Sequence, residues 1–222
     1  MMVAFAEIEQ AALARHGQAA VDARLSRPLS GDELRALPES FFLSQMSLRI
    51  FRAGLKHELV DRKWPAFEEV FDGFDPERCA RIPDERIEEM LGDKRLIRNL
   101  PKLRAVRANA GAVLALRGEG GIGGWLAGWP AARLIDLWDE LARRFQQLGG
   151  NSGPYFLRMV GKDSFILSDS VQRGLVHWGV LADLPPRKAD RAAIQQAFAG
   201  WMAETGRPSC QLSQILAMSL DT

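Results

Sequence analysis

RLIDLWDELARRF-QQLGGNSG-PYFLRMVGKDSFILSD, residues 133–169, is the stretch that decides the fold. Its first part repeats apolar residues at spacings of three and four, which predicts a helix with one apolar face. Gly149 and Gly150 then permit a tight turn that residues with side chains would strain. Pro154 suits the first turn of a second helix, and either Asn151 or Ser152 can cap that helix.

A helix that begins in this way presents exposed N–H groups and the positive end of its dipole. Proteins hold phosphate groups with this arrangement. Two interpretations of residues 148–153 therefore stand side by side. The turn is either a phosphate clamp or an ordinary corner between two helices, because short motifs of this kind also occur without function.

The rest of the chain also shows helical periodicity, and no run alternates like a strand, so we predict an all-α protein. Ser30 with Glu33 three residues later has the spacing of a capping box. We expect Pro65 and Pro101 each to set the start of a helix. Around Gly54 the pattern fits either a pair of helices or one helix with a break.

The composition is typical of a soluble globular protein. Of the 222 residues, 47% are hydrophobic and 26% are charged. This length suits one large domain or two small ones, and we expect a single helical domain over 1–222. The net charge of +1 argues against binding a polyanion by bulk charge, although a local basic face remains compatible with it. No apolar run approaches membrane-spanning length, so we expect a cytoplasmic protein with no membrane partner.

The cysteines and histidines give no sign of a metal site. Cys79 and Cys210 are far apart in sequence, and the three histidines are scattered. Zinc requires about four nitrogen or sulfur ligands close together. We therefore expect reduced, structural thiols, no bound metal and no cofactor.

Three stretches carry a family resemblance: FDGFDPERCARIPDERIEEML (71–91), KRLIRNLPKLRAVRANAGAVLAL (94–116) and RRFQQLGGNSGPYFLRMVG (143–161). The residues of the second stretch that fit the pattern without a gap are Ile97, Arg98, Asn99, Lys102, Ala105, Asn109 and Ala110. Arg52-Ala53-Gly54-Leu55 is similar to a Gln-Ala-Gly-Leu motif. Together these stretches resemble the 3-methyladenine DNA glycosylase I family, over about residues 45–165.

The resemblance implies an all-helical, helix–hairpin–helix DNA glycosylase-like fold, with the hairpin motif at about residues 133–161 and duplex DNA as the partner. The DNA-binding residues that it implies are Leu55, Arg98, Lys102, Gly149, Gly150, Asn151, Ser152 and Gly153. Phosphate contacts of this kind supply affinity without sequence information. Arg98 and Lys102 belong to a basic run that consists of Lys94, Arg95, Arg98, Lys102, Arg104 and Arg107. The alternative for this run is a solvated face opposite the acidic stretch 84–93.

A glycosylase flips its target nucleotide out of the duplex and then breaks the N-glycosidic bond. The resemblance implies excision of alkylated, 3-methyladenine-type bases in base-excision repair. In the wider helix–hairpin–helix superfamily a catalytic aspartate follows the hairpin, and Asp169 lies near that place. The alternative is that Ser168 or Asp169 only caps the next helix.

The sequence also departs from the family at its base pocket. The family's glutamate is Arg49 here, its pocket tryptophan is His57, and its zinc ligands have no counterparts. The pocket candidates are Arg49, Phe51, His57 and Trp64. Their alternative roles are core packing and surface charge, and Arg49 could instead pair with Glu58 or Asp61. Two hypotheses follow: a DNA glycosylase, or a non-catalytic DNA-binding or damage-recognition module of the same fold.

Overall fold

The computed structural model describes residues 3–220, and within this range all regular structure is helical and no residue lies in a strand. The all-α prediction is therefore confirmed. The chain forms two compact units. One, here called the terminal unit, consists of Met1–Leu29, Trp129–Leu137 and Gly161–Thr222, and the other, the central unit, consists of Ser30–Gly128 and Trp138–Val160. That the two units make up the single domain expected from the sequence stays a prediction.

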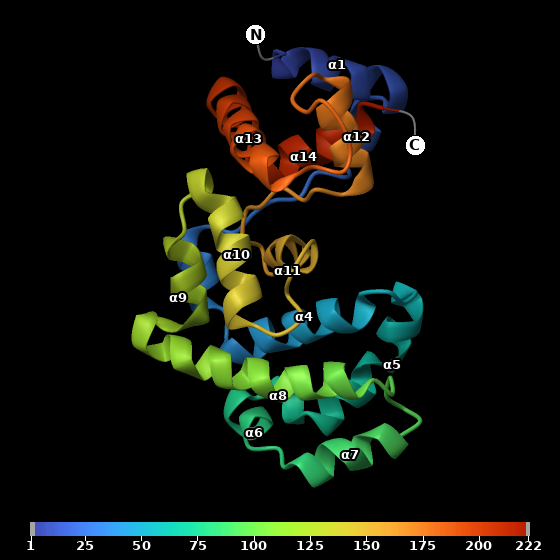
Figure 1. The fold of residues 1–222 in the computed structure, drawn as a ribbon, viewed down its shortest axis with the longest axis vertical. Coiled ribbons are helices and arrows are strands. Elements are labelled where there is room, and N and C mark those ends of the chain that lie inside the picture. Colours follow the sequence, from blue (N-terminus) through green and yellow to red (C-terminus); the bar gives the residue numbers. More distant parts are fainter. Residues whose placement is uncertain (1–2, 221–222) are drawn as a thin grey trace. The chain divides into compact units, whose positions relative to one another are not determined.

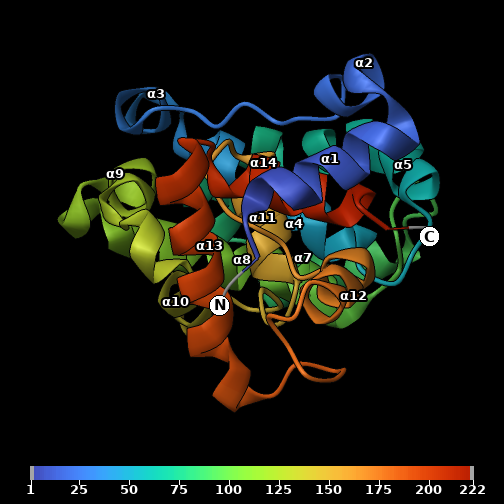
Figure 2. The same ribbon diagram turned by 90° about the horizontal axis from the view of Figure 1, so that it is seen from above.

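The terminal unit is a small helical cluster around its last helix. Its helices are α1 (Phe5–His16), α2 (Gln18–Asp22), η3 (Ala131–Arg133), α12 (Asp169–His177), η4 (Lys188–Asp190), α13 (Arg191–Thr205) and α14 (Ser209–Met218). Helix α14 contacts α1, α12 and α13, and the two ribbon views show it among them (Figures 1 and 2). The stacked rings of Phe165 and Phe198, with centroids 4.0 Å apart, belong to its core.

The central unit is built on α8. Its helices are α3 (Gly31–Ala36), α4 (Glu39–Arg52), α5 (His57–Val70), η1 (Asp72–Phe74), α6 (Pro76–Ala80), α7 (Asp84–Gly92), α8 (Leu100–Ala115), η2 (Leu116–Glu119), α9 (Gly121–Gly128) and α11 (Ser152–Met159). Helix α8 contacts α4, α6 and α7, and α4 also contacts α11 (Figure 1). This packing brings the end of α4 beside the start of α8.

Four aromatic rings form the core next to α5. Trp64 stacks on Phe67 at 5.1 Å and on Phe74 at 5.2 Å between ring centroids, and Phe71 stacks on both phenylalanines. Trp64, Phe67 and Phe71 follow one another at spacings of three and four, so one face of the helix supplies most of the cluster. Full burial of such rings contributes about 1.5–3 kcal/mol each.

Local signals set several of the helix boundaries. Ser30 Oγ accepts a hydrogen bond from the Glu33 N–H, and the Glu33 carboxylate accepts one from the Ser30 N–H, which confirms the capping box. The stretch around Gly54 is a pair of helices, since α4 ends at Arg52, Gly54 has φ +76°, and α5 begins at His57. Asn99 caps α8 by accepting from the Lys102 N–H.

The predicted helix start at Pro65 is wrong, because α5 runs through this residue from His57 to Val70. An internal proline removes one backbone hydrogen bond and crowds the preceding turn, at about 3 kcal/mol. The buried side chains on either side of it, Val60, Trp64 and Phe67, offset this cost by packing into the core.

Candidate nucleic-acid interface

The predicted hairpin is present between α10 (Leu134–Arg144) and α11 (Ser152–Met159). Helix α10 begins in the terminal unit and ends in the central unit, which also contains α11. The loop turns sharply, with φ +63° at Gln147 and +57° at Gly150. Glycine adopts this left-handed conformation without strain, so the second loop glycine has a conformational reason.

A buried side chain holds the loop against α8. Asn109 is fully buried, and its amide bonds to the backbone of Gln146 in both directions. Asn109 Nδ2 donates to the Gln146 carbonyl at 3.1 Å, and Asn109 Oδ1 accepts from the Gln146 N–H at 2.7 Å. The start of the loop is therefore fixed by a residue 37 positions earlier in the chain.

The tip of the loop is open to solvent. Gly149, Gly150 and Asn151 are exposed, and a Cβ atom placed on either glycine would meet no atom within 4 Å. Gly153 differs, because it is buried and a Cβ there would approach the Leu148 carbonyl to 3.0 Å. Gly149, Gly150 and Asn151 therefore lie at the surface, whereas Gly153 has a packing role.

The start of α11 is capped only weakly. Asn151 occupies the N-cap position, but its side chain does not accept a hydrogen bond from the first turn. The Ser152 N–H donates to the Gly149 carbonyl at 3.2 Å. Pro154 has no N–H, so this short terminus offers fewer donors than the sequence pattern suggested.

Two arginines of the basic run before and within α8 form ion pairs with acidic neighbours. Arg95 bonds to Asp93 and to Glu69, and Arg107 bonds to Asp84 at 2.7 Å. These two arginines match the alternative in which the basic run is a solvated face paired with nearby acidic side chains. Exposed pairs of this kind contribute little to stability, typically 0–1 kcal/mol.

Two of the predicted DNA-binding cations have different surroundings. Arg98 is exposed. Lys102 Nζ, by contrast, donates to the Ala53 carbonyl at 2.7 Å and to the Phe51 carbonyl at 3.4 Å, at the C-terminal end of α4. A cation is favourable there because the helix dipole is negative at that end. Leu55, in the turn that follows, is an exposed large hydrophobic residue, 38% accessible.

The four base-pocket candidates do not form one group. Phe51 is fully buried and Trp64 is 8% exposed, with ring centroids 6.4 Å apart in the aromatic core. Their environment matches the core-packing alternative. His57 is exposed at the first residue of α5, and Arg49 is half-buried on α4.

Arg49 faces α11. Its guanidinium carbon lies 4.6 Å from the centroid of the Tyr155 ring. The pairing with Glu58 or Asp61 that we considered is absent, since Asp61 bonds to Arg52 at 2.9 Å instead. Burial lowers the pKa of Arg49, Tyr155 opposes this shift, and the neighbouring charge of Arg52 lowers the pKa further.

Asp169 lies in the terminal unit at the first position of α12. Ser168 is the residue that caps this helix, because its Oγ accepts from the Val171 N–H at 3.3 Å. The Asp169 carboxylate is exposed and makes no hydrogen bond or ion pair with another residue in the range 3–220. The Asp169 carboxylate is therefore not used to cap α12.

Two residues of this region were not predicted as functional. Asn109 is one residue of the family pattern at 94–116, and no motif singles out Tyr155. Tyr155 is the only tyrosine of the chain and lies one turn into the helix that follows the loop. That position is the one signal in the sequence that could have drawn attention to it.

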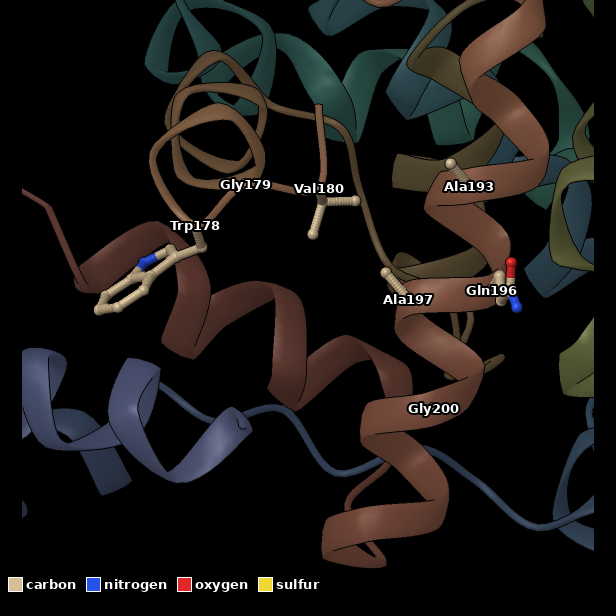
Figure 3. A pocket seen from close by; sticks show the side chains of 7 residues that line it. All are labelled: Trp178, Gly179, Val180, Ala193, Gln196, Ala197 and Gly200. Carbon is tan, nitrogen blue, oxygen red and sulfur yellow. The ribbon is translucent and has the colours of Figure 1, made fainter. Parts of the chain in front are cut away.

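A separate pocket of about 470 Å³ lies in the terminal unit, between residues 178–180 and α13 (Figure 3). Its lining residues are Trp178, Gly179, Val180, Ala193, Gln196, Ala197 and Gly200. None of them is ionisable, and none is a predicted site residue. The Trp178 indole N–H donates to Ser219 Oγ at 2.9 Å, so its polar atom is already satisfied.

Within residues 3–220 the structure contains no group of three or more histidine, cysteine, aspartate or glutamate side chains that could hold a metal ion. In the same range, no helix combines the length and the apolar character needed to cross a bilayer.

The arrangement is that of the all-helical DNA glycosylases. The chain is similar to 3-methyladenine DNA glycosylase I from Staphylococcus aureus, with 21% identity and a TM-score of 0.51 over 64% of this chain and 82% of that one. It is also similar to the 8-oxoguanine DNA glycosylase of Methanocaldococcus jannaschii, with 19% identity and a TM-score of 0.53 over 94% and 89% of the two chains. The M. jannaschii protein is also known in complex with a 15-mer DNA that contains 8-oxoguanine, and that structure matches with 18% identity and a TM-score of 0.53 over 95% and 93% of the two chains.

The sequence adds a likeness to one protein family. The model of the methyladenine glycosylase family matches residues 38–133, a region that includes Arg49, Lys102 and Asn109. Over this region the chain is similar to the methyladenine glycosylase family.

Proposed function

We propose that this protein binds duplex DNA through residues 148–153 and excises an alkylated base, in the manner of base-excision repair. The observation that carries the proposal is the exposed Gly149-Gly150 tip, held in place by the Asn109 amide. A rigid, uncrowded loop at a helix start lets a phosphate backbone approach closely. Exposed Arg98 would add affinity that falls with rising salt.

In the proposed reaction the target nucleotide leaves the stack, and water attacks the C1′ carbon of its sugar. The bond between C1′ and the base nitrogen breaks, the bonding electrons leave with the base, and the proton of the water is lost to solvent. Asp169 is the candidate carboxylate that stabilises the positive charge on the sugar. Its support is its place after the hairpin, its exposure and its lack of an ion pair.

The test is release of free bases from methylated duplex DNA, separated by chromatography. Whichever alkylated base the wild type releases should be released at least about 100-fold more slowly by Asp169→Asn, as loss of a catalytic group predicts. Asp22→Asn is the matched control, because Asp22 is an exposed carboxylate of the same unit whose hydrogen bonds go only to Gln18. Activity that is undiminished in Asp169→Asn would refute the catalytic assignment.

A non-catalytic DNA-binding module is the second candidate function. The observation that favours it is the half-buried cation at Arg49, where the resembled family keeps a glutamate. Such a module would bind methylated duplex DNA without releasing any base. Gel-shift titration beside the release assay separates the two functions.

A further inference from the structure

The Arg49 guanidinium is held in a position without an acceptor. Its central carbon lies over the Tyr155 ring, 4.6 Å from the ring centroid, and its Nε is buried with no hydrogen-bond partner. Within residues 3–220 the side chain makes no hydrogen bond or ion pair. A buried donor of a charged group that lacks an acceptor destabilises the folded protein, so Arg49 is held here at a cost in stability.

A second cation lies close enough to interact with it. Lys102 Nζ is fixed by the carbonyls of Ala53 and Phe51. Burial, and then the positive charge of Arg49, lowers the pKa of Lys102. The two partly desolvated positive charges thus repel each other.

No carboxylate compensates for these charges. The positive charge of Arg52 also lowers the pKa of Arg49. The nearby carboxylate of Asp61 is taken by Arg52, whose Nε lies 2.9 Å and whose terminal nitrogen lies 2.8 Å from Asp61 Oδ1. In the range 3–220, neither Arg49 nor Lys102 has an ion pair with an acidic side chain. An anion beside the terminal nitrogens of Arg49 would offset this repulsion.

We propose that Arg49 and Lys102, with Tyr155 as a stacking platform, form a binding subsite for a phosphate group. Nε is buried, so the two terminal nitrogens are the groups left to make the two-pronged contact that arginine makes with phosphate. Lys102 supplies a nearby point charge. The subsite extends the proposed DNA contact but does not depend on base excision. The phosphate group belongs either to a nucleic-acid backbone or to a free ion.

Isothermal titration of the full chain with inorganic phosphate tests the subsite directly. Three proteins are compared: the wild type, Arg49→Gln, and Arg104→Gln as a matched control. Arg104 is exposed on the same helix as Lys102, and its replacement removes the same charge outside the subsite. We expect phosphate affinity to fall at least tenfold in Arg49→Gln and to stay unchanged in Arg104→Gln.

Duplex DNA identifies the source of the phosphate. If it is the DNA backbone, inorganic phosphate competes with DNA, and Arg49→Gln lowers the slope of log affinity against log salt by about one. If Arg49→Gln loses phosphate binding but keeps its DNA affinity and salt slope, the ligand is a free phosphate. Base release is measured separately, so an inactive protein would refute excision and leave the subsite intact.

Urea unfolding separates a ligand site from a structural arginine. Because Arg49 is repelled by neighbouring cations and has no hydrogen-bond acceptor, we expect Arg49→Gln to unfold at the same or a higher urea concentration than the wild type. Arg49→Lys keeps the positive charge but loses the planar guanidinium that contacts phosphate with two N–H groups, so it should bind phosphate more weakly than the wild type. Undiminished phosphate binding by Arg49→Gln would overturn the proposal. So would a wild type that binds no phosphate, if Arg49→Gln also leaves the slope of log DNA affinity against log salt unchanged.

Discussion

Asn109 and Gln146 form a closed pair of hydrogen bonds between a buried side-chain amide and a loop backbone. The side chain of Gln146 takes no part in this pair, and the residue is exposed. We expect Asn109→Ala to lower the free energy of unfolding by about 1–3 kcal/mol, because two backbone groups lose their partner. Gln146→Ala is the control and should leave stability within about 0.5 kcal/mol. Equal urea midpoints for the two variants would contradict the anchor.

The loop tip permits a substitution that tests DNA docking without disturbing the fold. Gly149 does not have a positive φ, and a Cβ there would meet nothing within 4 Å. Gly149→Leu should therefore fold normally and obstruct an approaching backbone. We expect duplex affinity to fall at least about tenfold, or about 1.4 kcal/mol.

Gly92→Leu is the matched control for the loop, because Gly92 is an exposed glycine of α7 that is equally uncrowded. It should bind DNA like the wild type at each salt concentration. Fluorescence anisotropy with a labelled duplex measures both variants. If Gly149→Leu binds as tightly as the control at matched salt, residues 148–153 are not the DNA-binding surface.

Arg49 should disfavour a cationic alkylated base. The guanidinium is permanently charged and only donates hydrogen bonds, whereas a cationic purine requires an acceptor. We expect weak or absent release of 3-methyladenine by the wild type and stronger release by Arg49→Glu. Arg104→Glu makes the same charge change outside the subsite and should have no effect. Robust release of 3-methyladenine by the wild type would refute this role.

Cys79 should make stability fall at alkaline pH. Burial, followed by the charges of Asp75 and Asp72, raises the pKa of this thiol from 9.0 to about 12. Above pH 9 the unfolded chain loses the thiol proton while the folded protein keeps it, so rising pH favours unfolding until about pH 12. The contribution is about 1.4 kcal/mol per pH unit. Urea unfolding of Cys79→Ala at pH 8 to 11 should show a shallower decline than the wild type, and parallel curves would contradict the assignment.

We expect the purified protein to contain no structural zinc. Zinc in such a role needs about four nitrogen or sulfur ligands in one place, and Cys79 and Cys210 are separately buried. Packing holds the terminal helices instead, as between Phe5 and Trp201, whose ring centroids are 5.5 Å apart. Elemental analysis should find less than stoichiometric zinc, and chelator should leave the thermal midpoint unchanged. A one-to-one zinc content would be decisive against this view.

The sequence by itself determined the features that depend on neighbours along the chain. The helix–loop–helix at residues 133–161, the capping box at Ser30 and the entry to α8 at Pro101 all follow from short-range patterns. These signals act within one or two turns, so they can be read without tertiary information. The helix start expected at Pro65 failed for the complementary reason, since packing overrode the local preference.

Only the tertiary structure decided which polar groups meet across the fold. Asn109 meets the loop 37 residues later, Asp61 pairs with Arg52 instead of Arg49, and Tyr155 stacks on Arg49 from another helix. Helical periodicity shows which face of each helix is apolar, but it does not show which face of another helix it meets. The partners of charged and amide groups depend on that packing, and so the chemistry of Arg49 became visible only in the folded protein.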